Sequence, residues 1–199
     1  MPKAWSEREK DLVKKTLQTD GRKLFEKFGL QKTTVDDIVR AAHISKGAFY
    51  LFYSSKEMLY QEISEAIQGE NRRKIYEKVF EPAASRKEGF KAALRLTLDL
   101  LAATPLYRHM GTAEYGYLMR KLPEETKSES MMSYIDEFVG NFNAWIENGW
   151  MRKVDPLGLK GLFLSLFYLI IHREDFDEPG FTAAKELWID IISEYMIAD

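Results

Sequence analysis

The sequence predicts an all-α protein with an N-terminal three-helix helix-turn-helix DNA-binding domain and a larger helical domain after it. Three observations predict this fold class. Apolar residues recur at helical spacing along most of the 199 residues, no stretch alternates between apolar and polar residues as a strand would, and three helix-start signals fall close together within residues 33–57. We expect the first domain to span residues 1–54 and the second to span residues 55–199.

The two short helices predicted after residue 33, with the turn between them, form the most informative stretch. A helix over residues 6–28 should end at Gly29 and form the floor of the first domain. Thr34 and Asp37 have the spacing of a capping box, and Ser45 offers a second helix start soon afterwards. Two short helices joined by so tight a turn match the helix-turn-helix arrangement, whose second helix enters the DNA major groove.

The rest of the chain reads as further helices. Ser54 and Glu57 form another capping box, which opens a long helix ended by Pro82. The expected later helices cover residues 55–80, 87–103, 106–121, 124–148, 156–172 and 181–196. The last two of these suggest assembly, because a helix that is apolar nearly all round must be covered on every side. Either the domain itself buries the helix over residues 156–172, or a second copy covers it in an intermolecular four-helix bundle.

We favour the homodimer. Its predicted interface consists of Leu162, Leu166, Leu169, Trp188, Ile191 and Tyr195.

Composition limits the classes of function. Apolar residues make up 45% and charged residues 30% of the chain, which is typical of soluble globular proteins. Cysteine is absent, so disulfides and thiolate metal sites are excluded. The N-terminus lacks the apolar core of a signal peptide, and the longest apolar run, residues 161–171, is too short to span a bilayer. We therefore expect a cytoplasmic protein with no membrane partner.

Charge is distributed unevenly. The net charge of −2 alone argues against nucleic-acid binding. However, residues 1–60 hold 12 Lys and Arg against 8 Asp and Glu, whereas the remaining residues hold 17 against 23. A basic first part followed by an acidic second part supports DNA binding by the first part.

Three strings of residues in the first part stand out: Thr-Thr-Val-Asp-Asp-Ile-Val at 33–39, Ser-Lys-Gly-Ala-Phe-Tyr at 45–50 and Ser-Lys-Glu-Met-Leu at 55–59. With these strings, about residues 21–63 resemble the TetR/AcrR family of bacterial transcription regulators. The resemblance implies a homodimer that binds double-stranded operator DNA, is usually a repressor, and releases the operator when a small-molecule effector enters the helical domain.

The matching residues include groups suited to DNA. Lys46 can reach a guanine edge or a phosphate, the Tyr50 hydroxyl can donate to a phosphate, and Gly47 leaves the recognition helix free to approach the groove closely. The predicted DNA-binding residues are Thr33, Thr34, Ser45, Lys46, Gly47, Ala48, Tyr50 and Lys56. Thr34 and Ser45 could instead only cap helices, and Lys56 could be a solvated surface charge.

Three residues depart from the family pattern. His43 replaces the usual glycine of the turn, Phe52 replaces a residue that often donates to phosphate, and Leu51 lacks a polar group. These departures leave open a helical small-molecule-binding protein with weakened DNA binding, or a regulator that needs no ligand.

An effector pocket is expected in the second domain, lined by aromatic, aliphatic and Met side chains that suit a largely apolar or aromatic ligand. The predicted lining residues are Leu98, Leu101, His109, Met110, Tyr115, Tyr134, Phe138, Phe142, Trp145, Phe167 and Ile170. The alternative is that these residues form core. Arg108, Glu114 and Arg120 could select a charged ligand or simply lie at the surface.

No catalytic motif occurs: the chain has no Gly-rich phosphate loop, no H-E-x-x-H and no G-x-S-x-G. The three histidines are scattered, and His172 with Glu174 and Asp175 needs no metal to explain it. We expect neither an enzyme nor a bound metal or cofactor.

Overall fold

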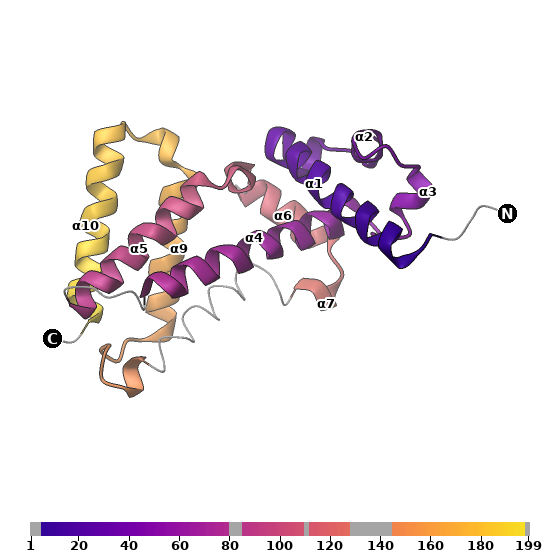
Figure 1. Ribbon diagram of the computed structural model, residues 1–199. Helices are drawn as coiled ribbons and strands as arrows, with labels where there is room; N and C mark the ends of the chain where they lie inside the picture. The colour runs from indigo at the N-terminus through magenta and orange to yellow at the C-terminus, as the bar shows by residue number, and fades with distance from the viewer. Residues whose placement is uncertain (1–4, 80–84, 110–111, 128–144, 198–199) are drawn as a thin grey trace. The chain divides into compact units, whose positions relative to one another are not determined.

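The computed structural model describes residues 5–79, 85–109, 112–127 and 145–197, which are helical apart from their connections (Figure 1). Within these residues the only β-type pairing is an isolated bridge between Met151 and Ile197, so the all-α prediction is confirmed. The chain divides into two compact units, one of residues 1–69 and 105–123 and the other of residues 70–104 and 124–199. The domain boundary predicted after residue 54 therefore does not coincide with an edge of either unit, and it stays a prediction.

The first unit begins with α1 (Glu7–Lys32). Ser6 and Glu9 close a capping box at its start, and its core side is marked by Leu17 and Phe25, which are fully buried. The regular helix breaks at Gly29, as predicted, although α1 continues beyond this glycine. Gly29 has φ 78° and ψ 169°, which kinks the chain before a last helical turn that reaches Lys32.

The two short helices of the motif follow as predicted. α2 (Val35–Ala41) starts at a capping box between Thr34 and Asp37, with the Thr34 hydroxyl 3.1 Å from the Asp37 amide. α3 (Lys46–Phe49) starts at Ser45, whose hydroxyl accepts from the Ala48 amide at 3.1 Å. The helix-turn-helix prediction is therefore confirmed in its local structure.

The first unit is completed by the first part of α4 (Lys56–Val79), by η1 (Pro105–His109) and by α6 (Thr112–Lys121). The single helix predicted over residues 106–121 is thus a 3₁₀ helix followed by a separate α-helix. Both η1 and α6 pack against α1. Residues 105–123 consequently support the helix-turn-helix motif although they lie far from it in sequence.

The second unit contains α5 (Arg86–Ala103), α7 (Glu124–Lys127), α9 (Pro156–Ile171), η2 (Arg173–Asp175) and α10 (Glu178–Met196) (Figure 1). Its apolar core joins α5, α9 and α10. Most of the helix predicted over residues 124–148 lies outside the described residues. None of the helices in the described part of the chain is long and apolar enough to cross a membrane.

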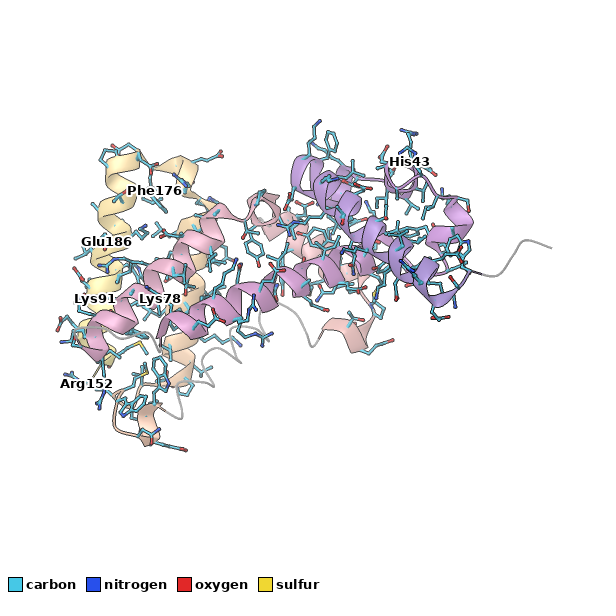
Figure 2. All side chains as sticks on the ribbon, in the orientation of Figure 1. His43, Lys78, Lys91, Arg152, Phe176 and Glu186 are labelled. Carbon is cyan, nitrogen blue, oxygen red and sulfur yellow. The ribbon has the colours of Figure 1, made fainter. Side chains whose placement is uncertain are left out.

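A row of ion pairs fixes the register of α10 along α5. Lys91 lies 2.8 Å from Asp190 and Arg95 lies 2.9 Å from Glu186, and Figure 2 labels Lys91 and Glu186 along the two helices. Lys87–Glu194 and Lys185–Asp99, each at 3.0 Å, extend the row. The hydrogen bond from Lys91 lowers the pKa of the Asp190 carboxyl. Because these pairs are solvated, we attribute the position of α10 mainly to its apolar core and its register to the charges.

Candidate nucleic-acid interface

The exposed side of α3 and the residues just after it form a small surface, which we call the recognition surface: Lys46, Gly47, Tyr50 and Leu51. Tyr50 is 51% exposed and Leu51 is 77% exposed. The opposite side of α3 is anchored, because Phe49 is fully buried and α3 packs on α2. The two buried residues, Ala48 and Phe49, lie between two pairs of exposed ones in the sequence. Burial of this middle pair therefore leaves the four residues of the recognition surface exposed to solvent.

Lys46 supplies the positive charge of the recognition surface. Its ammonium lies 3.0 Å from a carboxylate oxygen of Asp36 on α2, and this hydrogen bond raises the pKa of Lys46. The Lys46 side chain nevertheless remains 52% exposed. When its ammonium gives up the contact with Asp36, Lys46 can therefore donate to a guanine edge or to a phosphate.

Gly47 is not required by the fold of the protein. It does not have a positive φ, and a Cβ added there would come no closer than 3.9 Å, to the Ser45 hydroxyl. Glycine in a helix costs about 0.5–1 kcal/mol relative to alanine. The backbone of α3 is therefore open to close approach at Gly47.

Tyr50 and Phe52 point in different directions. The Tyr50 ring packs edge-on against Phe49, with centroids 5.4 Å apart, and half of the residue stays exposed. Phe52 instead stacks on Trp5, with centroids 5.8 Å apart. The departure from the family pattern at Phe52 is therefore explained by an aromatic partner ahead of α1.

The other residues predicted to bind DNA are placed differently. Thr34 and Ser45 are exposed, and their hydroxyls cap α2 and α3. Thr33 is only 1% exposed and donates its hydroxyl to the Gly29 carbonyl at 2.7 Å, and Ala48 is 6% exposed. The side chains of Thr33 and Ala48 are therefore mostly buried within the first unit.

Lys56 is occupied by the protein itself. Its ammonium donates to the carbonyls of Leu30 and Thr33 at 2.7 Å and of Gln31 at 3.1 Å. Partial burial lowers the pKa of Lys56. Lys56 thus holds the last turn of α1 and the residue after it, a set of contacts that we call the clamp, and it is not a free surface charge.

Glu114 completes this clamp from α6. The kink at Gly29 frees the amides of Leu30 and Gln31, and both donate to one carboxylate oxygen of Glu114, the Gln31 contact being 3.1 Å. Beside it, the Tyr117 hydroxyl donates to Glu57 at 2.9 Å. Sequence reasoning considered Glu114 only as a ligand-selecting or surface charge, since no local pattern links it to a segment 83 residues away.

Four of the predicted pocket residues lie together in the described structure, but in a packed core. Leu98 and Ile170 are buried in the core of the second unit, and Leu101 and Trp145 pack against that core. Tyr115 belongs to α6 of the first unit. Met110, Tyr134, Phe138 and Phe142 lie outside the described residues, as do the side chains of His109 and Phe167. The effector pocket therefore stays a prediction.

The predicted dimer residues fall into two groups. Leu166 is 3% exposed, and Leu162, Leu169 and Trp188 pack against the core of the second unit. Ile191 and Tyr195, by contrast, are 59% and 61% exposed.

In the described part of the chain no group of three His, Cys, Asp or Glu side chains could hold a metal ion.

His43 provides a test of the turn geometry. It lies exposed in the α2–α3 turn (Figure 2) and has φ 54°, the left-handed region that favours glycine. We expect His43→Gly to raise the free energy of unfolding by about 0.5–1 kcal/mol in urea denaturation, because the strain is relieved. His43→Ala, which keeps the strained φ, is the matched control and should bring no gain. Equal stability of the two variants would contradict this explanation.

Comparisons with known proteins agree with this geometry. The family model "Bacterial regulatory proteins, tetR family" matches residues 19–63. The transcriptional regulator YhgD of Bacillus subtilis is 25% identical over 92% of this chain and 94% of its own. RutR of Escherichia coli O157:H7, also a transcriptional regulator, is 27% identical over 82% of this chain and 74% of its own.

Solved structures share the fold over almost the whole chain. The fatty acid degradation regulator FadR from Bacillus halodurans has a TM-score of 0.65 at 19% identity, covering 96% of both chains. A TetR-family regulator from Mesorhizobium loti has a TM-score of 0.69 at 14% identity, covering 95% of this chain and 98% of its own. Both sequence relatives are helix-turn-helix-type transcriptional regulators. Residues 19–63, which hold the capped helix-turn-helix motif, therefore match the TetR family of bacterial regulatory proteins, and the chain as a whole is similar to transcriptional regulators.

Proposed function

We propose that this regulator is a cytoplasmic homodimeric repressor that binds double-stranded operator DNA through the recognition surface and releases it when a small molecule binds. The observation that carries the DNA-binding part is Gly47, an exposed glycine without an internal role, beside the exposed Lys46 and Tyr50. A helix of this kind enters the major groove when its backbone can come close to the base edges.

The remaining residues of the motif support this contact. Thr34 and Ser45 hold the starts of α2 and α3, and Thr33 and Lys56 hold the chain that leads into α2. In this proposal Lys46 donates to a base edge or phosphate, and the Tyr50 hydroxyl donates to a phosphate.

Two substitutions test the DNA contact. We expect Lys46→Ala to weaken binding to the DNA upstream of the regulated genes by about tenfold, and Tyr50→Phe by a smaller factor of about two to ten. Binding is measured by fluorescence anisotropy over a range of salt concentrations. If Lys46 contacts phosphate, Lys46→Ala also reduces the slope of log affinity against log salt by about one.

Lys153→Ala is the matched control, because it removes the same charge from an exposed position in the second unit. It should bind as the parent does. Parental affinity in both Lys46→Ala and Tyr50→Phe would contradict our placement of the DNA contact.

Among its described residues the second unit exposes large apolar side chains on α10 and on α9, which supports the homodimer. Leu187, Ile191 and Tyr195 recur every four residues on α10 and are each about 60% exposed. On α9, Leu157 and Tyr168 are also exposed. We propose that a second copy covers these side chains. The proposed interface thus differs from the one predicted from the sequence: it contains exposed residues in place of the buried Leu166 and the core-packed Trp188.

A charge placed in this face tests the dimer. We expect Ile191→Asp to shift the protein from dimer to monomer in analytical ultracentrifugation, because an unpaired carboxylate would be buried at the interface. Leu12→Asp is the control, since Leu12 is a similarly exposed leucine of α1 in the first unit. A parent protein that sediments as a monomer would contradict the dimer.

The proposed response to a ligand uses α6. Residues 105–123 belong to the first unit, yet the chain continues into the second unit at both of their ends. A ligand that rearranges this segment would act on Glu114 and so on the chain entering α2. We expect an effector found by thermal-shift screening to raise the melting temperature of the protein and to lower its operator affinity. A compound that stabilises the protein without changing operator affinity would speak against this mechanism.

A further inference from the structure

We propose that Leu51 reads the methyl group of a thymine in the operator, so that one position in each half-site is selected by apolar contact. This inference rests on the proposed DNA-binding function. It adds to that function the base type that the recognition surface selects, and it names the residue that selects it.

The direction of Leu51 is fixed by its neighbours. Its amide donates to the Ala48 carbonyl at 3.2 Å, which continues the turn of α3. The next residue, Phe52, is held by its stack on Trp5, and Tyr53 is 4% exposed beside Phe49. Phe52 and Tyr53 thus pack within the first unit, whereas the Leu51 side chain points into solvent, with 77% of the residue exposed.

Exposure alone would not be informative, because single exposed leucines are common on protein surfaces. The position of Leu51 makes it informative. It follows Gly47 by four residues and Lys46 by five, so it lies about one helical turn beyond the glycine that leaves space for a partner. Any double helix that approaches Gly47 closely enough to use that space also meets the Leu51 side chain.

The chemistry of leucine limits what it can recognise there. Its side chain has no hydrogen-bond donor or acceptor, so it cannot pair with a phosphate or with a polar base edge. The thymine C5-methyl is the apolar group that base pairs present in the major groove. Contact with that methyl removes apolar surface from water on both sides, and the same leucine placed against a cytosine or a purine edge gains less.

The test uses operator DNA selected by the parent protein from a random duplex library. Each thymine of the selected sequence is then replaced in turn by deoxyuridine, which keeps the base pair and removes only the methyl group. At one thymine per half-site we expect about a fourfold loss of affinity for the parent protein, the value of one buried methyl group. Leu51→Ala should bind the thymine operator more weakly than the parent and should not distinguish thymine from deoxyuridine at that position.

Leu51→Met is the conservative control, because it retains an apolar side chain of similar size and should retain part of the preference for thymine. Equal melting temperatures of the three proteins would show that the exposed substitutions leave the fold intact. The proposal is overturned if the parent binds every deoxyuridine operator as tightly as the thymine operator. It is also overturned if Leu51→Ala keeps the full penalty, since another residue would then contact the methyl.

The same experiment separates this inference from the proposed function. If the parent enriches no sequence from the library, DNA binding by the recognition surface fails and the inference fails with it. If it enriches a sequence whose binding is independent of every thymine methyl, the proposed function stands and only the role of Leu51 is lost.

Discussion

The helix-turn-helix motif depends on how the chain between α1 and α2 is held. Gly29 breaks the helix with a positive φ, and the break exposes backbone amides and carbonyls that need partners. Two side chains of opposite charge provide them. The Lys56 ammonium donates to three backbone carbonyls, and one Glu114 carboxylate oxygen accepts from two backbone amides. Hydrogen bonds to charged groups contribute about 1.5–3 kcal/mol each, so this clamp is a strong local constraint.

That constraint sets the position of everything that follows. The hydroxyl of Thr33 donates to the Gly29 carbonyl, and the next residue, Thr34, starts α2 with a capping box. The turn at His43 and the cap at Ser45 then determine where α3 begins. Because the connections from Gly29 to α2 and from α2 to α3 are short, a change of the backbone conformation at Gly29 would displace the recognition surface. The proposed reading of DNA therefore relies on charges that do not themselves lie on that surface.

Local signals in the sequence were sufficient for the helix starts. Thr34 with Asp37, and Ser45, follow capping rules that need only three neighbouring residues, and the structure shows them as predicted. The role of Gly29 was predicted less well, because a glycine after a helical pattern signals either a stop or a kink. The contact of Glu114 with Leu30 could not be predicted, since nothing in a helical repeat specifies a partner more than eighty residues away.

Helical periodicity also failed to separate the core from the proposed interface. Leu166 and Ile191 both recur at helical spacing on apolar helices, yet Leu166 is buried in its own unit and Ile191 is exposed. Periodicity shows that a face is apolar and does not show what covers it. Likewise, Ala48 and Gly47 are adjacent small residues, and only the packing of α3 shows that Ala48 faces inward.

Amide hydrogen exchange at Leu30 and Gln31 tests the clamp most directly. In the parent protein both amides should exchange slowly, and Glu114→Ala should speed their exchange by roughly tenfold or more, as expected for the loss of a hydrogen bond to a charged group. The Ala48 amide, which donates to Ser45, should be unaffected and serves as the internal reference. If Leu30 and Gln31 exchange as fast in the parent as in Glu114→Ala, the clamp does not hold the entry to α2 and the account is wrong.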